Sequence, residues 1–458
     1  MRMAAAAHTV GAKNRMSRAS VSQTETVEVA ADAFVFGYPL VLGDRMRIWM
    51  TDAARPDPVR MRAPPNQFVH AREVPGATAD GLVAPHADTL RSSAWLDLGD
   101  GPVVLNVPDT YGRFYALSMI DLWSNVFASV GARTTGCSRG AFGFVGPRGS
   151  GAGLPADVLP VAAPTRMVRI AGLTKVDGDG RFEEAHAVQD GLRLARLGPE
   201  PAPAVAGPER RRGRTPPVGE VERMDAATFF QELTRLMHDN PPRLQDRLML
   251  ERMRRVGLYG AGEDGWAALT PAARAAVERG AELGLARIVT AAEAPPGEPA
   301  GSWRIRFGLG DFGTDHLSRA AAACAGLETG PAADELPALV QVDADGRALY
   351  GRHRYELRFP PGGEPPVFAF WTLTTYDDRQ PLVDNPTDRY SIGDWNGLTL
   401  DPDGSMPIAI QHRAPDADGH RNWLPAPPGR FNVLLRLIWP MPEVLDRRWA
   451  PPAVHRIG

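Results

Sequence analysis

Two separate parts of the chain carry short runs in which β-branched and aromatic residues predominate. In the first part, residues 64–170, the runs at 103–107 and 114–120 are separated by turn signals such as Gly99 to Gly101. This pattern predicts short antiparallel strands joined as meanders, packed as a β-sandwich or jelly roll.

The second part begins near residue 338 and continues almost to the C-terminus. Strands are expected over 350–359, 367–376, 408–411 and 431–439. Alternation predicts that five apolar residues of the last strand share one face: Phe431, Val433, Leu435, Leu437 and Trp439. Residues 367–373 are apolar on both faces, which is typical of a central strand.

Helical spacing dominates the region between these two parts. Phe229, Leu233, Leu236 and Met237 form one stripe, and further helices are expected over 244–255, 271–292 and 314–324. Thr270 is a suitable N-cap for the helix expected over 271–292, because Pro271 then occupies its first position.

An apolar helix is predicted near the N-terminus, from Thr24 onward. We expect Gly37 to Pro39 to end or kink it, because proline lacks the amide proton and restricts its predecessor, and a continuation over residues 40–50 is left open. Asp32, Gly37 and Pro39 interrupt the apolar stretch 30–42, so no membrane span is predicted. Residues 1–23 are expected to be a disordered tail without the apolar core of a signal peptide, which favours a cytoplasmic location.

The expected fold class is therefore mixed and mainly β. Two antiparallel sandwich-like or jelly-roll-like domains are joined by a helical insert. The predicted boundaries are 24–197 for the N-terminal β domain with its leading helix, 198–219 for a linker rich in Pro and Arg, 220–330 for the helical insert and 331–458 for the C-terminal β domain.

Composition excludes several function classes. The net charge is −3, with 51 basic and 54 acidic residues, so nothing directs the whole molecule toward nucleic acid or anionic lipid. The run Arg210 to Arg212 is interpreted as a solvated loop. Cys137 and Cys324 are far apart and define no disulfide framework. We expect a small molecule as the partner, and a homo-oligomer is left open.

Two glycine-rich segments resemble nucleotide-binding loops only formally. Gly308 to Gly313 follows a predicted strand, yet Arg304 and Arg306 in that strand argue against a buried parallel sheet, so a turn is favoured. The segment 143–153 lacks a phosphate-binding lysine and is interpreted as a hairpin loop. No GxSxG motif indicates an α/β-hydrolase.

Candidate acid–base residues occur in the first β region. His70, Asp88 and Asp121 combine an imidazole with carboxylates and could serve as a general base with its orienting group. If the strand at 114–120 continues, Asp121, Trp123 and Asn125 lie on one face and could orient a polar ligand. The structural alternative is turn-capping carboxylates and a buried tryptophan.

Candidate ligand-binding residues gather near the C-terminus. Trp371, Tyr376 and Trp423 could form an apolar wall, while Arg389 and Asn422 supply polar groups. An arginine can bind a carboxylate or phosphate with two hydrogen bonds. The alternative is a set of core aromatic residues with a structural arginine.

A local zinc motif is absent, and no cofactor is predicted. A metal site assembled from distant strands remains an alternative. It would draw on His70, His86, His412 and His420, together with Asp88 and Asp121.

Motifs in both β regions resemble two bacterial domain-of-unknown-function families, 1254 and 1214, which usually occur fused in one chain. The N-terminal motifs are Phe36 to Pro39, Asn66 to His70, Val83 to Leu90, Ala94 to Leu98, Pro108 to Tyr115 and Asp121 to Asn125. The C-terminal motifs are Tyr355 to Phe359, Phe370 to Asp377, Arg389 to Ile392 and Asn422 to Phe431. The helical middle adds Asn240 to Pro242, Asp246 and Phe312 to Asp315, so the resemblance covers roughly residues 27–440.

The resemblance implies two β-sandwich-like domains joined by a helical insert, and it implies no reaction. Many relatives carry secretion signals, which this chain does not show. From the residues, the first hypothesis is a hydrolase-like or other cofactor-light enzyme acting on a small polar or amphipathic metabolite. The alternatives are a non-catalytic protein that binds a carbohydrate or lipid-like ligand, and an oligomeric scaffold.

Overall fold

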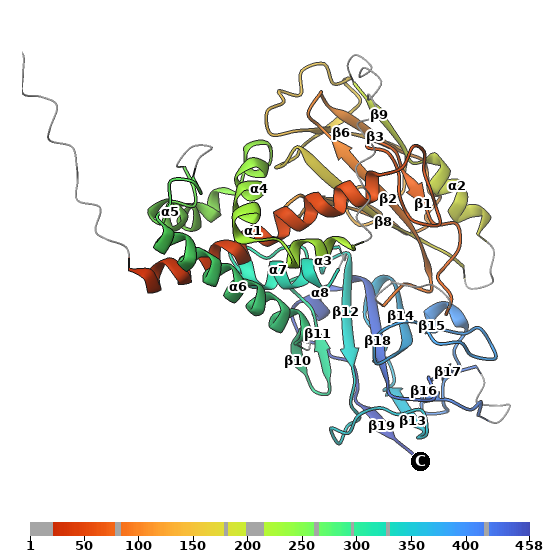
Figure 1. The fold of residues 1–458 in the computed structure, drawn as a ribbon. Helices are drawn as coiled ribbons and strands as arrows, with labels where there is room; N and C mark the ends of the chain where they lie inside the picture. Colours follow the sequence, from red (N-terminus) through yellow and green to blue (C-terminus); the bar gives the residue numbers. More distant parts are fainter. Residues whose placement is uncertain are drawn as a thin grey trace, which may run out of the picture.

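The computed structural model describes residues 22–77, 84–177, 182–197, 215–260, 265–294, 297–326, 330–415 and 421–458. Two β domains lie one above the other in Figure 1; helices α4 (Ala226–Asp239), α5 (Arg247–Arg255) and α6 (Pro271–Glu293) lie to their left, and α2 (Glu183–Gly191) lies on the right of the upper domain. Most of the predicted tail (residues 1–21) and of the predicted linker (198–214, with Arg210 to Arg212) lies outside the described residues.

The N-terminal β domain consists of two sheets. One has the order β1 (Val69–His70), β2 (Thr89–Asp97), β8 (Met167–Lys175), β4 (Tyr115–Asp121) and β5 (Val126–Gly131); the other has the order β7 (Leu159–Ala162), β6 (Gly140–Val145), β3 (Val103–Val107) and β9 (Arg193–Arg196). Leu96, Leu105, Met119, Phe144 and Ile170 belong to one core contributed by both sheets. Helix α2 (Glu183–Gly191) precedes β9.

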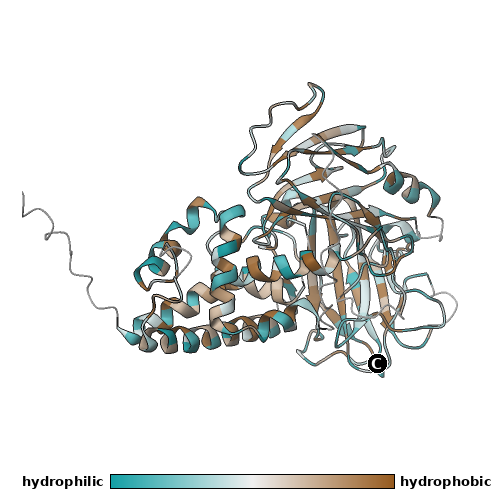
Figure 2. Ribbon diagram, turned by 45° about the horizontal axis from the view of Figure 1, so that its top comes forward, coloured by the Kyte–Doolittle hydropathy of each residue, from teal (hydrophilic) through white to brown (hydrophobic). Residues whose placement is uncertain are grey.

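The C-terminal β domain repeats this arrangement with a larger core. Its first sheet has the order β10 (Glu298–Ala300), β11 (Trp303–Ile305), β12 (Glu335–Val340), β18 (Phe431–Pro440), β14 (Val367–Asp377) and β15 (Ser391–Gly393). Its second sheet has the order β17 (Trp423–Pro425), β16 (Met406–Gln411), β13 (Tyr355–Phe359) and β19 (Val454–Arg456). The short helix α8 (Pro442–Leu445) follows β18. Figure 2 shows the central strands as largely apolar.

The prediction of a mainly β fold with a helical part is confirmed, with local corrections. Strands β6 and β7 pair in parallel, as do β16 and β17, whereas only antiparallel pairs were expected. The segment 146–158 explains the first parallel pair, because a parallel return needs a crossover of roughly a dozen residues. Strands β10 and β11, placed in the helical insert by the sequence, join the C-terminal sheet.

Helix α1 (Gln23–Thr51) includes the continuation over residues 40–50 that the sequence left open. It runs through Pro39, so the alternative in which the helix ends at residues 37–39 is wrong. Both Tyr38 and Leu40 are fully buried, and such packing offsets the backbone hydrogen bond that proline removes. By length and composition α1 could cross a membrane, but 78% of its apolar window is buried inside this fold.

Helix α1 belongs to the helical domain, and its residues share one core with those of the other helices. The other members of this domain are α3 (Pro217–Glu222), α4 (Ala226–Asp239), α5 (Arg247–Arg255), α6 (Pro271–Glu293) and α7 (His316–Cys324), and the 3-10 turn Leu244–Asp246 precedes α5. Another 3-10 turn, Asp394–Asn396, belongs to the C-terminal β domain. Phe34 of α1 stacks on Phe229 of α4, with ring centroids 4.1 Å apart. The predicted stripe of α4, Phe229 to Met237, is buried in this core.

Close packing of α1 on α6 depends on glycine. A Cβ atom at Gly280 would lie 2.5 Å from the Cβ of Ala30 and 2.6 Å from the carbonyl oxygen of Val27. The Gly280→Val substitution is therefore expected to lower the free energy of unfolding by about 2 kcal/mol, because the two helices must move apart. Urea denaturation measures this, with Ala272→Val at an exposed position of α6 as the control. Equal losses in both variants would show that helix propensity, not packing, is responsible.

Candidate functional site

A cavity of about 310 Å³ lies between the two β domains. Strands β2, β4 and β8 form one wall, and β12 and β18 form the opposite wall. Met46 of α1 and the end of α7 close one side. The cavity thus lies where the outer faces of two sheets meet, each of which turns its other face to its own domain core.

Alternation along β18 explains why polar groups reach this cavity. Val433, Leu435 and Leu437 point into the C-terminal core, so their neighbours Asn432, Leu434 and Arg436 point to the opposite side and line the cavity. Four members of the predicted face follow the prediction. Trp439 does not, because its positive φ of 53° breaks the alternation and it packs beside Phe368 instead.

The polar wall includes three members of a group of four buried charged residues: His86, Asp88, Glu335 and Arg436, hereafter the charged cluster. All of them except Asp88 line the cavity. His86 Nδ1 lies 3.5 Å from Asp88 Oδ1, and His86 Nε2 lies 3.3 Å from Glu335 Oε1. Arg436 Nε lies 3.3 Å from the same Glu335 oxygen. The side chain of His86 is 13% exposed, whereas those of Asp88 and Glu335 are 2% and 4% exposed. The imidazole is therefore the most accessible of these groups.

Beside the charged cluster, two side chains of the C-terminal domain donate hydrogen bonds to backbone carbonyls of the N-terminal domain. The Tyr376 hydroxyl donates to the carbonyl of Pro85 at 2.7 Å and accepts a hydrogen bond from Arg436 Nη1 at 2.9 Å. Arg436 Nη2 also donates to the carbonyl of Ala84. The residues before β2 are thereby held against β14 and β18, and His86 is fixed opposite Glu335.

The electrostatics favour a protonated His86 between two ionised carboxylates. Burial alone would lower the pKa of His86, yet Glu335 and Asp88 beside the ring raise it above its ordinary value. Burial alone would raise the pKa values of Asp88 and Glu335, but His86 and Arg436 lower them. The charged cluster therefore combines two cations with two anions.

Several buried polar atoms of the cluster lack a hydrogen-bond partner among the described residues. They include Nδ1 of His86, both carboxylate oxygens of Asp88 and Oε1 of Glu335. The ion-pair distances above exceed the usual hydrogen-bond range. Because buried polar atoms are normally satisfied, His86 and Glu335, which line the cavity, have the capacity to bind polar groups that enter it.

Arginines dominate the rest of the lining. Arg91, Arg169, Arg306 and Arg436 line the cavity, against the carboxylates Asp334 and Glu335. Asp334 is already engaged, because it accepts hydrogen bonds from Ser129 at 2.6 Å and Arg133 at 2.5 Å.

Arg306 follows β11 and differs from the other cavity arginines. Within the described ranges it forms no ion pair, and its Nε lacks a hydrogen-bond partner. Burial, together with the nearby charge of Arg436, lowers the pKa of Arg306 to about 10, so it remains a cation at neutral pH. An unpaired, partly desolvated guanidinium in a cavity is suited to bind a carboxylate or phosphate.

The charged cluster predicts how stability depends on pH. The raised pKa of His86 stabilises the fold fully below its ordinary value near 6.5, and this contribution is lost as the pH rises through the folded-state pKa. The lowered pKa values of Asp88 and Glu335 stabilise the fold above pH ~4.5, and their contribution is lost as the pH falls. We expect the largest contribution between about pH 5 and 6.5.

Urea denaturation from pH 5.5 to 8.5 tests this dependence. Wild type should lose stability on the alkaline side, and His86→Gln should lose less over the same interval because the titrating group is gone. Parallel pH profiles for the two proteins would contradict the assignment of a charged His86.

His70, predicted to be catalytic, lies outside the charged cluster. It sits on β1 with its Nδ1 atom 2.8 Å from the hydroxyl of Ser92, and that hydroxyl also accepts a hydrogen bond from Gln189. Burial lowers the pKa of His70 to about 4, so the ring is neutral at neutral pH. His70 does not line the cavity, although Ser92 does.

Asp121 lies in a third environment, where it organises the turn after β4. Its Oδ1 accepts hydrogen bonds from the backbone amides of Trp123 at 3.0 Å and Asn125 at 2.8 Å, and its Oδ2 lies 3.0 Å from Arg243. Asn125 adds two side-chain hydrogen bonds. Burial raises the pKa of Asp121, although Arg243 and Asn125 oppose the shift. The structure does not bring His70, Asp88 and Asp121 into one site.

Trp123 contributes to packing at this turn. Its ring lies 4.8 Å from that of Phe36, and its indole nitrogen donates to the carbonyl of Asn240 at 3.2 Å. The guanidinium of the fully buried Arg319 lies 5.6 Å from the same ring. Asp121, Trp123 and Asn125 therefore join the first β domain to the helices, as in the structural alternative.

The Asp121→Ala substitution is expected to lower the free energy of unfolding by about 3 kcal/mol. It leaves two buried amides and the Arg243 guanidinium without their acceptor. Chemical denaturation measures the loss. Asp311→Ala, an exposed carboxylate outside this network, is the control and should change stability by less than about 0.5 kcal/mol. Comparable stability for the two variants would contradict the structural role of Asp121.

The predicted C-terminal binding residues separate into two groups. Tyr376 contacts the charged cluster, as described above. Trp371 lies in the domain core beside Phe359, with ring centroids 5.6 Å apart. Arg389 donates to the carbonyl of Trp423 at 3.0 Å, while Trp423 is buried and donates to the carbonyl of Gln411 at 2.8 Å.

The side chain of Asn422 connects strand β16 to the segment that contains Thr399. Its amide donates to the carbonyls of Thr399 at 2.7 Å and Pro407 at 2.8 Å, and its oxygen accepts from the amide of Thr399 at 2.8 Å. These bonds use most of its capacity. Asn422, Trp371, Arg389 and Trp423 do not line the interdomain cavity.

Among the residues that the structure describes, those weighed for a metal site do not assemble one. No group of three or more potential ligands was found in the part of the chain that the structure describes. In the charged cluster each imidazole nitrogen faces a carboxylate, which suits a proton rather than a metal ion. His412 Nδ1 lies 3.0 Å from the carbonyl of Ala426, and His420 lies outside the described residues. Cys137 and Cys324 are free thiols.

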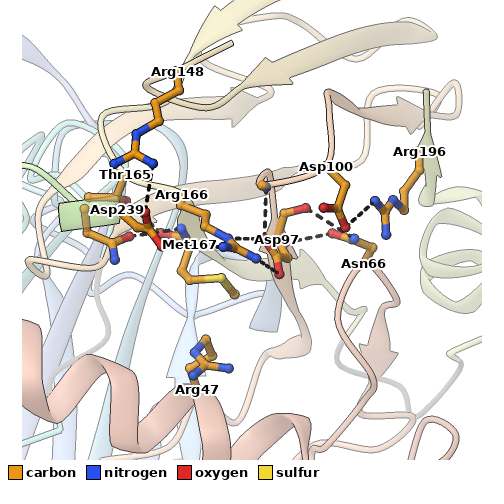
Figure 3. Close-up of polar contacts among 12 residues, drawn as sticks. Arg47, Asn66, Asp97, Asp100, Arg148, Thr165, Arg166, Met167, Arg196 and Asp239 are labelled. Atoms are coloured by element: carbon orange, nitrogen blue, oxygen red, sulfur yellow. Dashed lines mark hydrogen bonds and ion pairs between the residues drawn. The ribbon is translucent and has the colours of Figure 1, made fainter. Parts of the chain in front are cut away.

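A second polar network, far from the charged cluster, joins the first β domain to α4 (Figure 3). Arg166 lies 2.8 Å from Asp97 and 3.5 Å from Asp239, and Arg148 lies 3.1 Å from Asp239. Arg148 belongs to the glycine-rich segment 143–153, which begins in β6 and continues as a loop. The prediction of a hairpin loop is wrong, because the strands on either side, β6 and β7, pair in parallel. These carboxylates are engaged, so the network fixes two domains together and offers a ligand less free capacity than the cavity does.

The fold and the cavity define a class of protein with two β domains, a helical domain and a ligand-sized space between the β domains. Residues 65–196 match the family described as protein of unknown function (DUF1254), and residues 334–442 match protein of unknown function (DUF1214). The chain therefore contains a match to each of these two families, the former in its N-terminal part and the latter in its C-terminal part, as the motifs predicted.

One solved structure shares this fold, and a second was found at a lower similarity. The VPA0106 protein from Vibrio parahaemolyticus is 21% identical with a TM-score of 0.69, over 94% of this chain and 100% of that one. An uncharacterised protein from Burkholderia cenocepacia is 11% identical with a TM-score of 0.45, over 95% of this chain and 94% of that one. No curated protein matched the sequence. The first similarity supports the fold alone.

Proposed function

We propose that the protein is an enzyme that carries out acid–base chemistry on a small anionic metabolite bound between its two β domains. One observation carries the proposal: His86 is held between two buried carboxylates on the wall of a cavity that four arginines also line. Sites of this kind combine a concave space, a few convergent polar groups and shifted pKa values.

Each residue has a role that its surroundings support. Arg306 would bind the anionic group of the ligand, because its guanidinium has no ion-pair partner among the described residues. His86, as an imidazolium, would donate a proton to a leaving group, and Asp88 would orient the ring. In a hydrolysis, a water molecule attacks the scissile bond, the leaving group takes the proton of His86, and the proton released by water restores the imidazolium. Neither step requires a bound cofactor.

A second candidate is a non-catalytic binding protein for the same anionic ligand. The observation that favours it is that both nitrogens of His86 face carboxylates, so that in this candidate the ring serves only to neutralise Asp88 and Glu335. In that case the arginines would supply affinity and no proton would be transferred.

Metabolite profiling separates the two candidates. Purified wild type, His86→Gln and the control His455→Gln, an exposed residue of β19, are incubated with a bacterial metabolite extract and analysed by mass spectrometry. The enzyme proposal expects an anionic metabolite to be consumed by wild type and by the control but not by His86→Gln. Binding without consumption in all three proteins would favour the second candidate.

We also infer that each pair of sheets forms a β-sandwich, because in both β domains the two sheets contribute to one core. A jelly-roll strand order, a cytoplasmic location and a protein without a resident cofactor are retained as proposals from the sequence. Nucleic acid is not proposed as a partner, since the net charge of −3 does not favour it. A homo-oligomer is left to a measurement of mass in solution.

A further inference from the structure

We propose that the ligand is amphipathic, with its anionic group in the interdomain cavity and a short apolar group in a second cavity beside it. This inference rests on the proposed function and specifies the class of ligand. A carboxylate that carries a short alkyl chain or a single aromatic ring has the required chemistry.

The second cavity adjoins the first. It has a volume of about 90 Å³, and three residues line both spaces: Met46 of α1, Arg169 of β8 and Gly326 after α7. Arg169 lies at the junction, with its guanidinium 5.9 Å from the ring centroid of Trp95, a residue of the second cavity. A ligand bound near Arg169 therefore faces both spaces.

The two linings differ in chemistry. Mainly aliphatic and aromatic side chains line the second cavity. They come from α1, the strands β2, β4 and β5, the segment 309–312 and α7, and include Leu42, Trp95, Ile120, Val126, Phe312 and Ala323. Asp121 is also present, but its carboxylate is already engaged by Arg243 and two backbone amides. Arg169 is the other charged residue of this lining, and it lies at the junction with the first cavity.

The volumes bound the size of the ligand. A space of about 90 Å³ suits a short chain or one ring rather than a long acyl chain. Each methylene buried there should tighten binding about fourfold, which corresponds to ~0.8 kcal/mol per methylene. Affinity should therefore rise with chain length and stop rising once the apolar cavity is full.

A homologous series of carboxylates tests the inference on the full chain. Isothermal titration calorimetry with butyrate, hexanoate and octanoate should give Kd values that fall by about fourfold per methylene between the first two acids. Ala323→Leu and Val126→Phe each add bulk to the second cavity at a half-buried position, so one can replace the other if it fails to fold. In these variants the Kd of butyrate should be unchanged and the gain for longer acids should be lost.

The outcomes separate this inference from the proposed function. If wild type binds all three acids equally while Arg306→Gln binds none, the apolar subsite is refuted and the anion site stands. If the chain-length gain persists in both filled variants, the tail lies elsewhere and the inference is also refuted. If wild type binds no carboxylate and no inorganic phosphate, both the anion site and this inference fail.

Discussion

Replacing Arg436 by methionine is expected to lower the free energy of unfolding by about 4 kcal/mol. Arg436 is 3% exposed and its Nε lies 3.3 Å from Glu335. Without its charge, the buried carboxylates of Glu335 and Asp88 are balanced only by His86. The substitution also removes the hydrogen bonds to Tyr376 and to the carbonyl of Ala84, which join the two β domains.

Arg306→Met is the matched control for this prediction, because it changes the same residue type in the same cavity. Arg306 has no ion-pair partner in the described ranges, so its loss leaves no carboxylate unpaired. We expect a change in stability below about 1 kcal/mol, measured by urea denaturation at pH 6.5. Equal losses for the two variants would mean that Arg436 acts only by filling space.

Replacing His86 by glutamine is expected to lower kcat by about 10²- to 10⁴-fold for the substrate that profiling identifies. Glutamine keeps the polarity of the side chain but cannot donate a proton as imidazolium does. Binding of the anionic group should be largely kept, since Arg306 remains in place. The steady-state parameters measured across pH 5 to 9 check this prediction.

Arg306→Gln provides the opposite pattern for comparison. It should raise KM strongly and change the shape of the pH–rate profile little, whereas His86→Gln should remove from that profile the limb that reports the imidazole. If His86→Gln instead raised KM and left kcat unchanged, the role of His86 would be to bind the ligand, and the binding-protein alternative would gain support.

Local patterns in the sequence predicted much of the architecture. The alternation of Val433, Leu435 and Leu437 identified the core face of β18, and the stripe from Phe229 to Met237 identified the buried face of α4. These predictions depend only on the periods of strand and helix, so they need no knowledge of distant parts of the chain. At Pro39 the alternative in which the helix ends was wrong, because burial of the surrounding helix outweighs the local preference of proline.

The candidate site could be predicted only in part. Asp88 and Tyr376 were selected from the sequence, and both belong to or contact the charged cluster. His86 was considered only as a metal ligand, and Glu335 and Arg436 were missed, because they meet His86 only when two β domains face each other.

One sequence signal could have revealed Arg436. It is the single charged residue of the strand Phe431–Pro440, which is apolar apart from Arg436 and Asn432. Such an arginine must find a partner or a cavity on the outer face of its sheet. Asp121 and Asn422 were predicted to act on a ligand, but the structure gives them a local role. Their conspicuous polar groups are used up in local hydrogen bonds, which sequence spacing cannot distinguish from ligand binding.

The most direct test of the central claim, that the space between the β domains is the ligand site, is a crystal structure with 6-bromohexanoate. We predict a carboxylate within hydrogen-bond distance of the Arg306 guanidinium, and an anomalous bromine peak in the adjoining apolar cavity near Ala323 and Val126. A bromine peak found only outside the space between the β domains, for example beside Arg148 in the network of Figure 3, would contradict the account.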